Sequence, residues 1–148
     1  MDLHFRPMRL HSRIQETPDT FTQNFVPLDG KPFANRPGQF TIVKVGETGV
    51  CRPYTVSSTH GISEFVTTTV CRVPGGCASN WITTVPVGST VYLADPMGDF
   101  TCDDDPMEKF LLMASGSGIT PILSMTRWLL VNKRKHPMGS VSKNKKRA

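Results

Sequence analysis

The stretch with the clearest chemical character is Arg52-Pro-Tyr-Thr55. Arginine carries a planar fork of donors that matches a phosphate group. Tyr54 stands two positions later, which places its ring on the same face of a strand, and a tyrosine ring packs flat against another aromatic system. Thr55 adds a hydroxyl. These side chains suit a ligand that is both anionic and aromatic; the alternative is a surface arginine and a core tyrosine on an ordinary strand.

Two glycine turns are further candidates for anion binding. Gly76 lies just before a short predicted helix, whose first N–H groups would face an anion, and Ser79 adds a hydroxyl. The turn from Gly116 to Pro121 follows an apolar run and opens a longer predicted helix, which is the context of a nucleotide-phosphate loop. It is not a full Gly-x-Gly-x-x-Gly motif, because Pro121 replaces the third glycine. In both cases a plain turn without a ligand is the alternative.

Six short segments, rich in alternating or β-branched residues and separated by turns, are predicted as strands. They are residues 7–15, 20–26, 40–45, 50–57, 64–73 and 90–94. Residues 78–84 are predicted to form one or two helical turns. Short strands linked mostly by hairpins indicate an antiparallel barrel or sandwich, and we expect a small barrel closed by one short helix.

The pattern changes after the sixth strand. Residues 109–115 form an apolar run, typical of a parallel strand buried on both faces. Thr120 suits the N-cap of the following helix and Pro121 its first position. Four residues share one face of this helix: Ile122, Met125, Trp128 and Leu129. This strand–turn–helix unit lacks the neighbours that a parallel strand needs, so we expect a truncated, frameshifted or fragmentary chain.

Composition and charge argue against several functional classes. No run approaches the about 18 apolar residues of a membrane helix, and the N-terminus lacks the apolar core of a signal peptide. We therefore expect a cytoplasmic protein without membrane contact. The net charge is +5, but residues 133–148 hold seven of the 17 basic residues and none of the 12 acidic ones. A nucleic-acid-binding protein is thus an alternative that depends on this tail alone.

Metal ligands and catalytic side chains are not predicted. The four cysteines are Cys51, Cys71, Cys77 and Cys102, which form no Cys-x-x-Cys pair, so we expect reduced core residues and no iron–sulfur cluster. Three consecutive aspartates at 103–105 read as a solvated run. The four histidines are scattered, with no Ser/His/Asp arrangement.

Arg52-x-Tyr-Thr, Pro96-x-Gly-x-Phe100 and the turn from Gly116 to Pro121 together resemble the ferredoxin–NADP reductase superfamily, over roughly residues 8–136. The resemblance implies a mainly β fold with a six-stranded antiparallel Greek-key barrel that binds FAD, in residues 1–106. It implies the first strand–helix unit of an incomplete α/β NAD(P)-binding domain in residues 107–136. Residues 137–148 would be a disordered basic tail.

The resemblance also assigns roles to residues. It implies that Arg52 binds the flavin phosphate, Tyr54 stacks on the isoalloxazine ring and Thr55 hydrogen-bonds near the reactive edge of the ring. The resemblance places the remaining expected cofactor-binding residues close to FAD or NAD(P)H. Near FAD they are Val70, Cys71 and Arg72, beside the flavin and adenosine, and Gly76, Cys77, Ala78 and Ser79, at the diphosphate. Near NAD(P)H they are Gly116, Ser117 and Gly118, at the pyrophosphate, and Thr120, near the nicotinamide. Gly76 and Ser79 favour FAD over FMN.

The function implied by the resemblance is a flavin-dependent NAD(P)H oxidoreductase, of which this chain would be a fragment. Electrons would pass from NADH through FAD to an iron–sulfur acceptor, such as the hybrid-cluster protein or a ferredoxin-like domain. Full-length relatives carry a 2Fe-2S domain that this sequence lacks, so we expect little turnover by this chain alone. The alternative is a flavin-binding module or remnant without turnover. NADH or NADPH as donor, the acceptor and the oligomeric state stay open.

Overall fold

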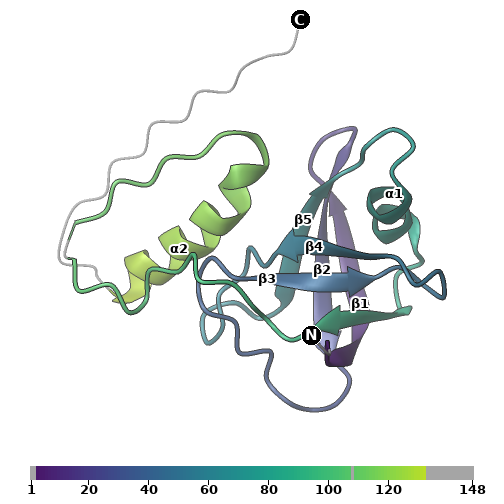
Figure 1. Cartoon of the computed structure of the whole chain (residues 1–148), viewed down its shortest axis with the longest axis horizontal. Helices are drawn as coiled ribbons and strands as arrows, with labels where there is room; N and C mark the ends of the chain where they lie inside the picture. The colour runs from purple at the N-terminus through teal and green to yellow at the C-terminus, as the bar shows by residue number, and fades with distance from the viewer. Residues whose placement is uncertain (1–2, 108, 133–148) are drawn as a thin grey trace, which may run out of the picture.

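The computed structural model describes residues 3–107 and 109–132 (Figure 1). Its strands are β1 (Phe5–Gln15), β2 (Thr20–Pro27), β3 (Phe40–Lys44), β4 (Cys51–Thr55), β5 (Val66–Cys71) and β6 (Thr90–Ala94). Helix α1 (Cys77–Thr84) lies between β5 and β6, and the short 3-10 helix η1 (Gly116–Gly118) leads into α2 (Ile119–Asn132). The six strands predicted for the barrel and both predicted helices are therefore confirmed.

The strands form one antiparallel sheet in the order β4-β3-β6-β1-β2-β5. The sheet curves until its two edge strands meet, where Val56 forms an isolated bridge with Thr68 and the Ser57 N–H donates to the Thr67 carbonyl at 2.8 Å. This contact closes the barrel, as predicted. In the described chain, β4 and β5 are otherwise paired only with β3 and β2. We call the open stretch between β4 and residues 69–71 of β5 the seam.

The barrel core follows from the alternation of side chains along the strands. Fully buried side chains from different strands include Met8, Leu10, Phe25, Val43 and Leu93. Helix α1 adds Ile82, which is also fully buried. Burial of each such side chain contributes about 1.5–3 kcal/mol, so α1 is held to the barrel by the same core that holds the strands.

A second, smaller cluster lies between α2 and the linker that leads to it. Cys102, Met125 and Leu129 are buried there. Ile122 and Trp128 pack against them, so the apolar face predicted for this helix is confirmed. Linker and barrel are also joined by ion pairs, since the Arg36 guanidinium donates to Asp103 at 2.8 Å and lies 2.7 Å from Asp104. These two aspartates are paired, which corrects their interpretation as a solvated run.

Three further predictions are wrong. Residues 109–115 form no strand, and Leu111 and Met113 are 84% and 79% exposed, because the described chain offers no neighbouring strand on which this run could pair. Thr120 lies inside α2 rather than at its N-cap, and its hydroxyl donates to the Ser117 carbonyl at 2.8 Å. Cys71 and Cys77 are exposed rather than part of the core.

Two other expectations concern the ends of the chain and its relation to membranes. The basic tail predicted for residues 137–148 lies outside the described residues, as do residues 133–136 of the predicted nucleotide-binding unit. Among the helices that the structure describes, none combines the length and the hydropathy needed to cross a membrane.

Candidate functional site

The seam presents the two side chains that the sequence singled out. Arg52 pairs with Val43 and Tyr54 with Thr41, and both of these β3 partners are fully buried. Directly opposed residues of antiparallel strands point to the same face of the sheet, so Arg52 and Tyr54 share the inner face. Because β4 is an edge strand, this face opens on the seam. Arg52 stays exposed there, whereas Tyr54 packs partly against the core.

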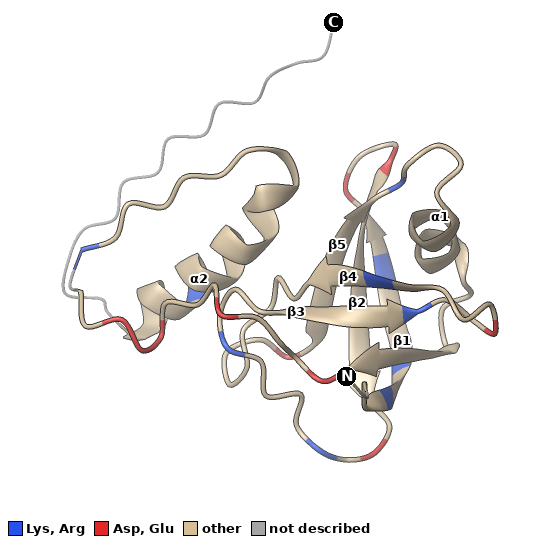
Figure 2. Ribbon diagram, in the orientation of Figure 1, with Lys and Arg blue, Asp and Glu red and all other residues tan. Residues whose placement is uncertain are grey.

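The Arg52 guanidinium is available to an anion. Its Nη1 donates to the Cys51 carbonyl at 2.8 Å, and within residues 3–107 and 109–132 it forms no ion pair with a carboxylate. The described acidic residues all lie in loops and linkers, none in a strand or helix (Figure 2). A phosphate beside β4 would therefore meet a positive charge without a neighbouring carboxylate on the strand.

Tyr54 is held neutral with its ring against the core. Burial raises the pKa of its phenol, and the positive charge of Arg52 partly opposes this rise. The middle of α1 is near the β3–β4 hairpin, since a Cβ added to Gly46 would lie 3.5 Å from the Trp81 ring nitrogen. Helix α1 thus covers the Arg52 end of β4.

The glycine turn before α1 fits a diphosphate by its backbone. Gly76 is the N-cap, without a side-chain hydrogen bond and without an acidic residue in the first turn. The N–H groups of a first turn have no acceptor within the helix, and the helix dipole favours an anion beside them. A Cβ on Gly76 would lie 2.6 Å from the Ser79 hydroxyl. That hydroxyl accepts from the Val73 N–H at 3.1 Å, so Ser79 holds the turn together.

Only one of the three candidates at the end of β5 turns its backbone toward the seam. Val70 pairs with Phe21, and the Arg72 N–H donates to the Asp19 carbonyl at 2.6 Å, so both backbones face β2. In an antiparallel ladder the residues between them face the other way, which gives the seam Cys71 and also Thr69. Sequence reasoning missed Thr69, because it is identified only by the strand register.

The Arg72 side chain has a structural partner. Its Nε donates to the Thr83 hydroxyl at 3.0 Å, and its guanidinium lies 4.6 Å from the centre of the Phe21 ring. Arg72 therefore joins the end of β5 to the last turn of α1, and its charge does not reach the seam as a free phosphate ligand.

The second glycine turn lies at the opposite end of β4. Gly116 and Ser117 are exposed in front of the 14-residue helix α2, and the Gly118 N–H donates to the Ser115 carbonyl at 3.0 Å. Figure 1 shows α1 and α2 on opposite sides of the barrel with β4 between them. A ligand along β4 would run from Arg52 and α1 toward Thr55 and α2.

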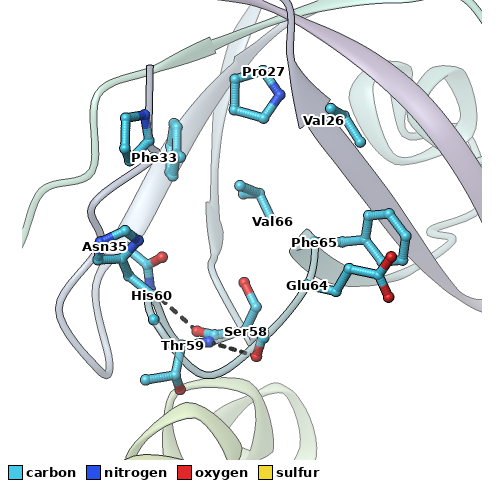
Figure 3. Close-up of a pocket in the computed structure, with 13 residues that line it drawn as sticks. Val26, Pro27, Phe33, Asn35, Ser58, Thr59, His60, Glu64, Phe65 and Val66 are labelled. Carbon is cyan, nitrogen blue, oxygen red and sulfur yellow. Dashed lines mark hydrogen bonds between the residues drawn. The ribbon is translucent and has the colours of Figure 1, made fainter. Parts of the chain in front are cut away.

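A pocket of about 250 Å³ lies elsewhere, on the loop between β4 and β5 (Figure 3). Phe33, Val26 and Val66 form its apolar wall, and His60 and Glu64 are at its rim. None of the predicted cofactor-binding residues lines it. Its lining comes from separate segments of the chain, which no local sequence pattern would connect.

The chain is similar to oxidoreductases that contain an FAD-binding domain. The family model described as "Oxidoreductase FAD-binding domain" matches residues 7–102. NADH oxidoreductase HCR of Escherichia coli (strain K12) is 46% identical over 128 residues, which are 85% of this chain and 39% of that protein. The glycine betaine monooxygenase reductase subunit of Chromohalobacter salexigens is 40% identical over 118 residues, covering 78% of this chain and 32% of that protein.

Solved structures agree with this similarity. Phthalate dioxygenase reductase, described as a modular structure for electron transfer from pyridine nucleotides to [2Fe-2S], has a TM-score of 0.76 at 25% identity. The match covers 86% of this chain and 40% of that one. The ferredoxin reductase in carbazole 1,9a-dioxygenase shares the fold, with a TM-score of 0.80 at 22% identity over 90% of this chain and 41% of that one. The chain spans about two fifths or less of the length of these relatives.

Proposed function

Because the chain belongs to the family of oxidoreductase FAD-binding domains, we propose that it binds FAD along the seam and serves in a flavin-dependent NAD(P)H oxidoreductase. The observation that carries this proposal is that Arg52 and Tyr54 share the inner face of β4, near helix α1, whose start at Gly76 has no side-chain cap. A cationic fork, an aromatic face and free N–H groups in a row match a ligand with a phosphate at one end and a ring at the other.

The arrangement along β4 gives the ligand a direction. We assign the phosphate groups to Arg52 and to the backbone N–H groups of Cys77 and Ala78, where charge-assisted and backbone hydrogen bonds add. Gly76, whose own N–H donates to the Val73 carbonyl at 2.9 Å, shapes the turn that presents them. Tyr54 then packs on the isoalloxazine ring, and Thr55 lies near the ring edge on the α2 side. Ser79 contributes by holding the turn.

The roles of this chain's residues are binding and orientation. FAD, when bound, accepts a hydride and releases electrons singly. Tyr54, packed against the core, keeps water from one face of the ring. The backbone groups of Thr69 and Cys71 face the seam. Val70 and Arg72 hold this end of β5 in place through their backbone hydrogen bonds toward β2. We assign Gly116, Ser117, Gly118 and Thr120 to the NAD(P)H side, where α2 begins.

For the electron acceptor we propose an iron–sulfur protein, such as the hybrid-cluster protein or a ferredoxin-like domain. The printed names of NADH oxidoreductase HCR and of phthalate dioxygenase reductase, with its [2Fe-2S], support an acceptor of this class. The separate cores of the barrel and of the α2 cluster support a division into an FAD unit and a nucleotide unit, proposed as residues 1–106 and from 107 on; Cys102 of the linker packs in the α2 cluster.

A second candidate function is a flavin-binding module without turnover. The absence of a strand at residues 109–115, where Leu111 and Met113 are exposed, favours it, because the nucleotide side of the site then lacks a supporting strand in the described chain.

The visible absorption spectrum of the purified chain tests both candidates. FAD is added, excess is removed by desalting, and NADH is then added without oxygen. Flavin bands that persist through desalting are expected, and bleaching by NADH supports the oxidoreductase. Retained flavin without bleaching selects the module. A folded chain that retains no FAD, with folding checked by circular dichroism, overturns the proposed function.

A further inference from the structure

Helix α2 is hydrogen-bonded to the loop that follows β4. The Ser124 hydroxyl donates to the Ser58 carbonyl at 2.8 Å, and the Arg127 guanidinium donates to the Ser57 carbonyl at 2.5 Å. In the other direction, the Thr59 hydroxyl donates to the Ser124 carbonyl at 2.9 Å. Three successive loop residues are therefore tied to one turn of α2. We call residues 57–59 with Ser124 and Arg127 the junction.

The junction is polar, and four of its five residues are buried. Ser57, Ser58, Thr59 and Ser124 are each at most 2% exposed. From the pocket side, the Asn35 amide also donates to the Ser58 carbonyl at 3.1 Å (Figure 3). Buried polar groups must all be paired, and a fully paired network favours a single arrangement of its members. The junction therefore fixes α2 to the barrel more tightly than apolar packing alone would.

The same loop residues close the barrel. The Ser57 N–H donates to the Thr67 carbonyl at 2.8 Å, and the Thr67 N–H donates to the Ser58 hydroxyl at 2.9 Å. Only Val56, bridged to Thr68, separates this loop from Thr55. Helix α2 therefore contacts the loop at the point where β4 separates from β5. The hydrogen bonds from Ser124 and Arg127 thus influence the width of the seam at its Thr55 end.

We propose that Ser124 and Arg127 are positioning residues for the flavin site. By holding the carbonyls of Ser57 and Ser58, they fix the end of β4 that carries Tyr54 and Thr55. Because α2 begins at the Gly116–Gly118 turn, the same contacts set the distance between that turn and the seam. This inference rests on the proposed function, since it concerns FAD bound along β4.

Four variants test the proposal. Ser124→Ala removes the hydroxyl, Arg127→Met removes the guanidinium, and Arg127→Lys keeps a positive donor. Asn132→Ala is the matched control, because Asn132 donates to the Trp128 carbonyl within α2 and its side chain is exposed. FAD affinity is measured by quenching of flavin fluorescence, and the absorption spectrum of the bound flavin is recorded for each variant.

Ser124→Ala and Arg127→Met are each expected to raise the Kd for FAD about tenfold, as expected for the loss of one buried hydrogen bond, and to shift the flavin absorption bands. Arg127→Lys should recover most of the affinity, and Asn132→Ala should match the wild type. A shift of the flavin absorption bands distinguishes a positioning role from a loss of stability alone. If Ser124→Ala fails to fold, the Arg127 variants still test the proposal, because Arg127 is only partly buried.

The outcomes that overturn the inference are distinct from those that overturn the proposed function. If the wild-type chain binds FAD and the Arg127→Met variant binds it with the same Kd and spectrum, the positioning role is wrong and the proposed function stands. If Arg127→Lys is as weak as Arg127→Met, the hydrogen bond to Ser57 is not the cause. If the folded wild-type chain binds no FAD, both fall.

Discussion

Substitution of Gly38 by alanine should separate the linker from the barrel. Gly38 has a φ of +99°, and a Cβ at this position would lie 2.1 Å from the Phe100 carbonyl oxygen and 2.5 Å from Met125 Cε. The methionine side chain can move aside, but Phe100 contributes backbone. The alanine methyl group therefore has to displace the linker that leads to α2.

Two costs add in this variant. A positive φ costs a residue with a Cβ about 1–2 kcal/mol, and forcing an extra carbon into a packed site costs about 1–3 kcal/mol. We expect Gly38→Ala to lower the free energy of unfolding by about 2–5 kcal/mol. The matched control is Gly88→Ala, because Gly88 has a φ of +94° but no atom within 4 Å of the added Cβ. It should lose only the backbone cost of about 1–2 kcal/mol.

Urea unfolding followed by circular dichroism measures both variants against the wild type. A loss in Gly38→Ala that clearly exceeds the loss in Gly88→Ala supports the close contact between the turn and the linker. Equal losses would refute it, because the backbone conformation alone would then explain the whole effect.

Three further predictions concern the seam and the linker. Arg52→Ala should raise the Kd for FAD about 10- to 100-fold in a fluorescence titration, since a charge-assisted contact is worth about 1.5–3 kcal/mol. Tyr54→Ala should weaken FAD binding and change the visible spectrum of the bound flavin, because the ring loses its aromatic neighbour. Hydrogen bonds from Arg36 lower the pKa of Asp103 below its ordinary value of 3.8. The folded chain then binds fewer protons than the unfolded one, so the stability that this ion pair contributes is present above about pH 4 and is lost as the pH falls through the lowered pKa. When melting temperatures are measured from about pH 5 to about pH 2.5, the melting temperature of Asp103→Asn should fall less than that of the wild type.

Each of these predictions can fail in a specific way. An unchanged affinity in Arg52→Ala would show that Arg52 does not meet the phosphate. An unchanged flavin spectrum in Tyr54→Ala would remove the stacking role. Parallel pH curves for the wild type and Asp103→Asn would show that the ion pair with Arg36 does not contribute to acid stability.

The local features of this fold could be predicted from the sequence. Alternation of side chains identifies strands because it reflects which face is buried, and β6 was expected at residues 90–94, as the structure has it. The spacing of Met125 and Leu129 likewise predicts the core face of α2, on which both residues are buried. The chemical types of Arg52 and Tyr54 identify β4 as a candidate ligand-binding strand from sequence alone.

Features that depend on pairing could not be predicted. The run at 109–115 has the composition of a buried strand, but composition does not supply a neighbour. Ser79 was expected to face a ligand, whereas its hydroxyl accepts from the Val73 backbone within its own turn. The backbone of Arg72 was expected to face the ligand, but in the structure the backbone of Thr69 faces the seam and that of Arg72 faces β2. Strand register decides which backbone groups reach the seam, and no single segment encodes it.

The place of β1 in the sheet has a consequence for the order of folding. β1 pairs with β2, its immediate successor, but its other neighbour is β6, more than eighty residues later in the chain. During synthesis, the first hairpin can form early, yet one edge of β1 stays unpaired until residues 90–94 have been made. Closing such a long loop is slow, and an unpaired edge is a template for other chains. Nascent and refolding chains are therefore exposed to aggregation until β6 has inserted between β1 and β3.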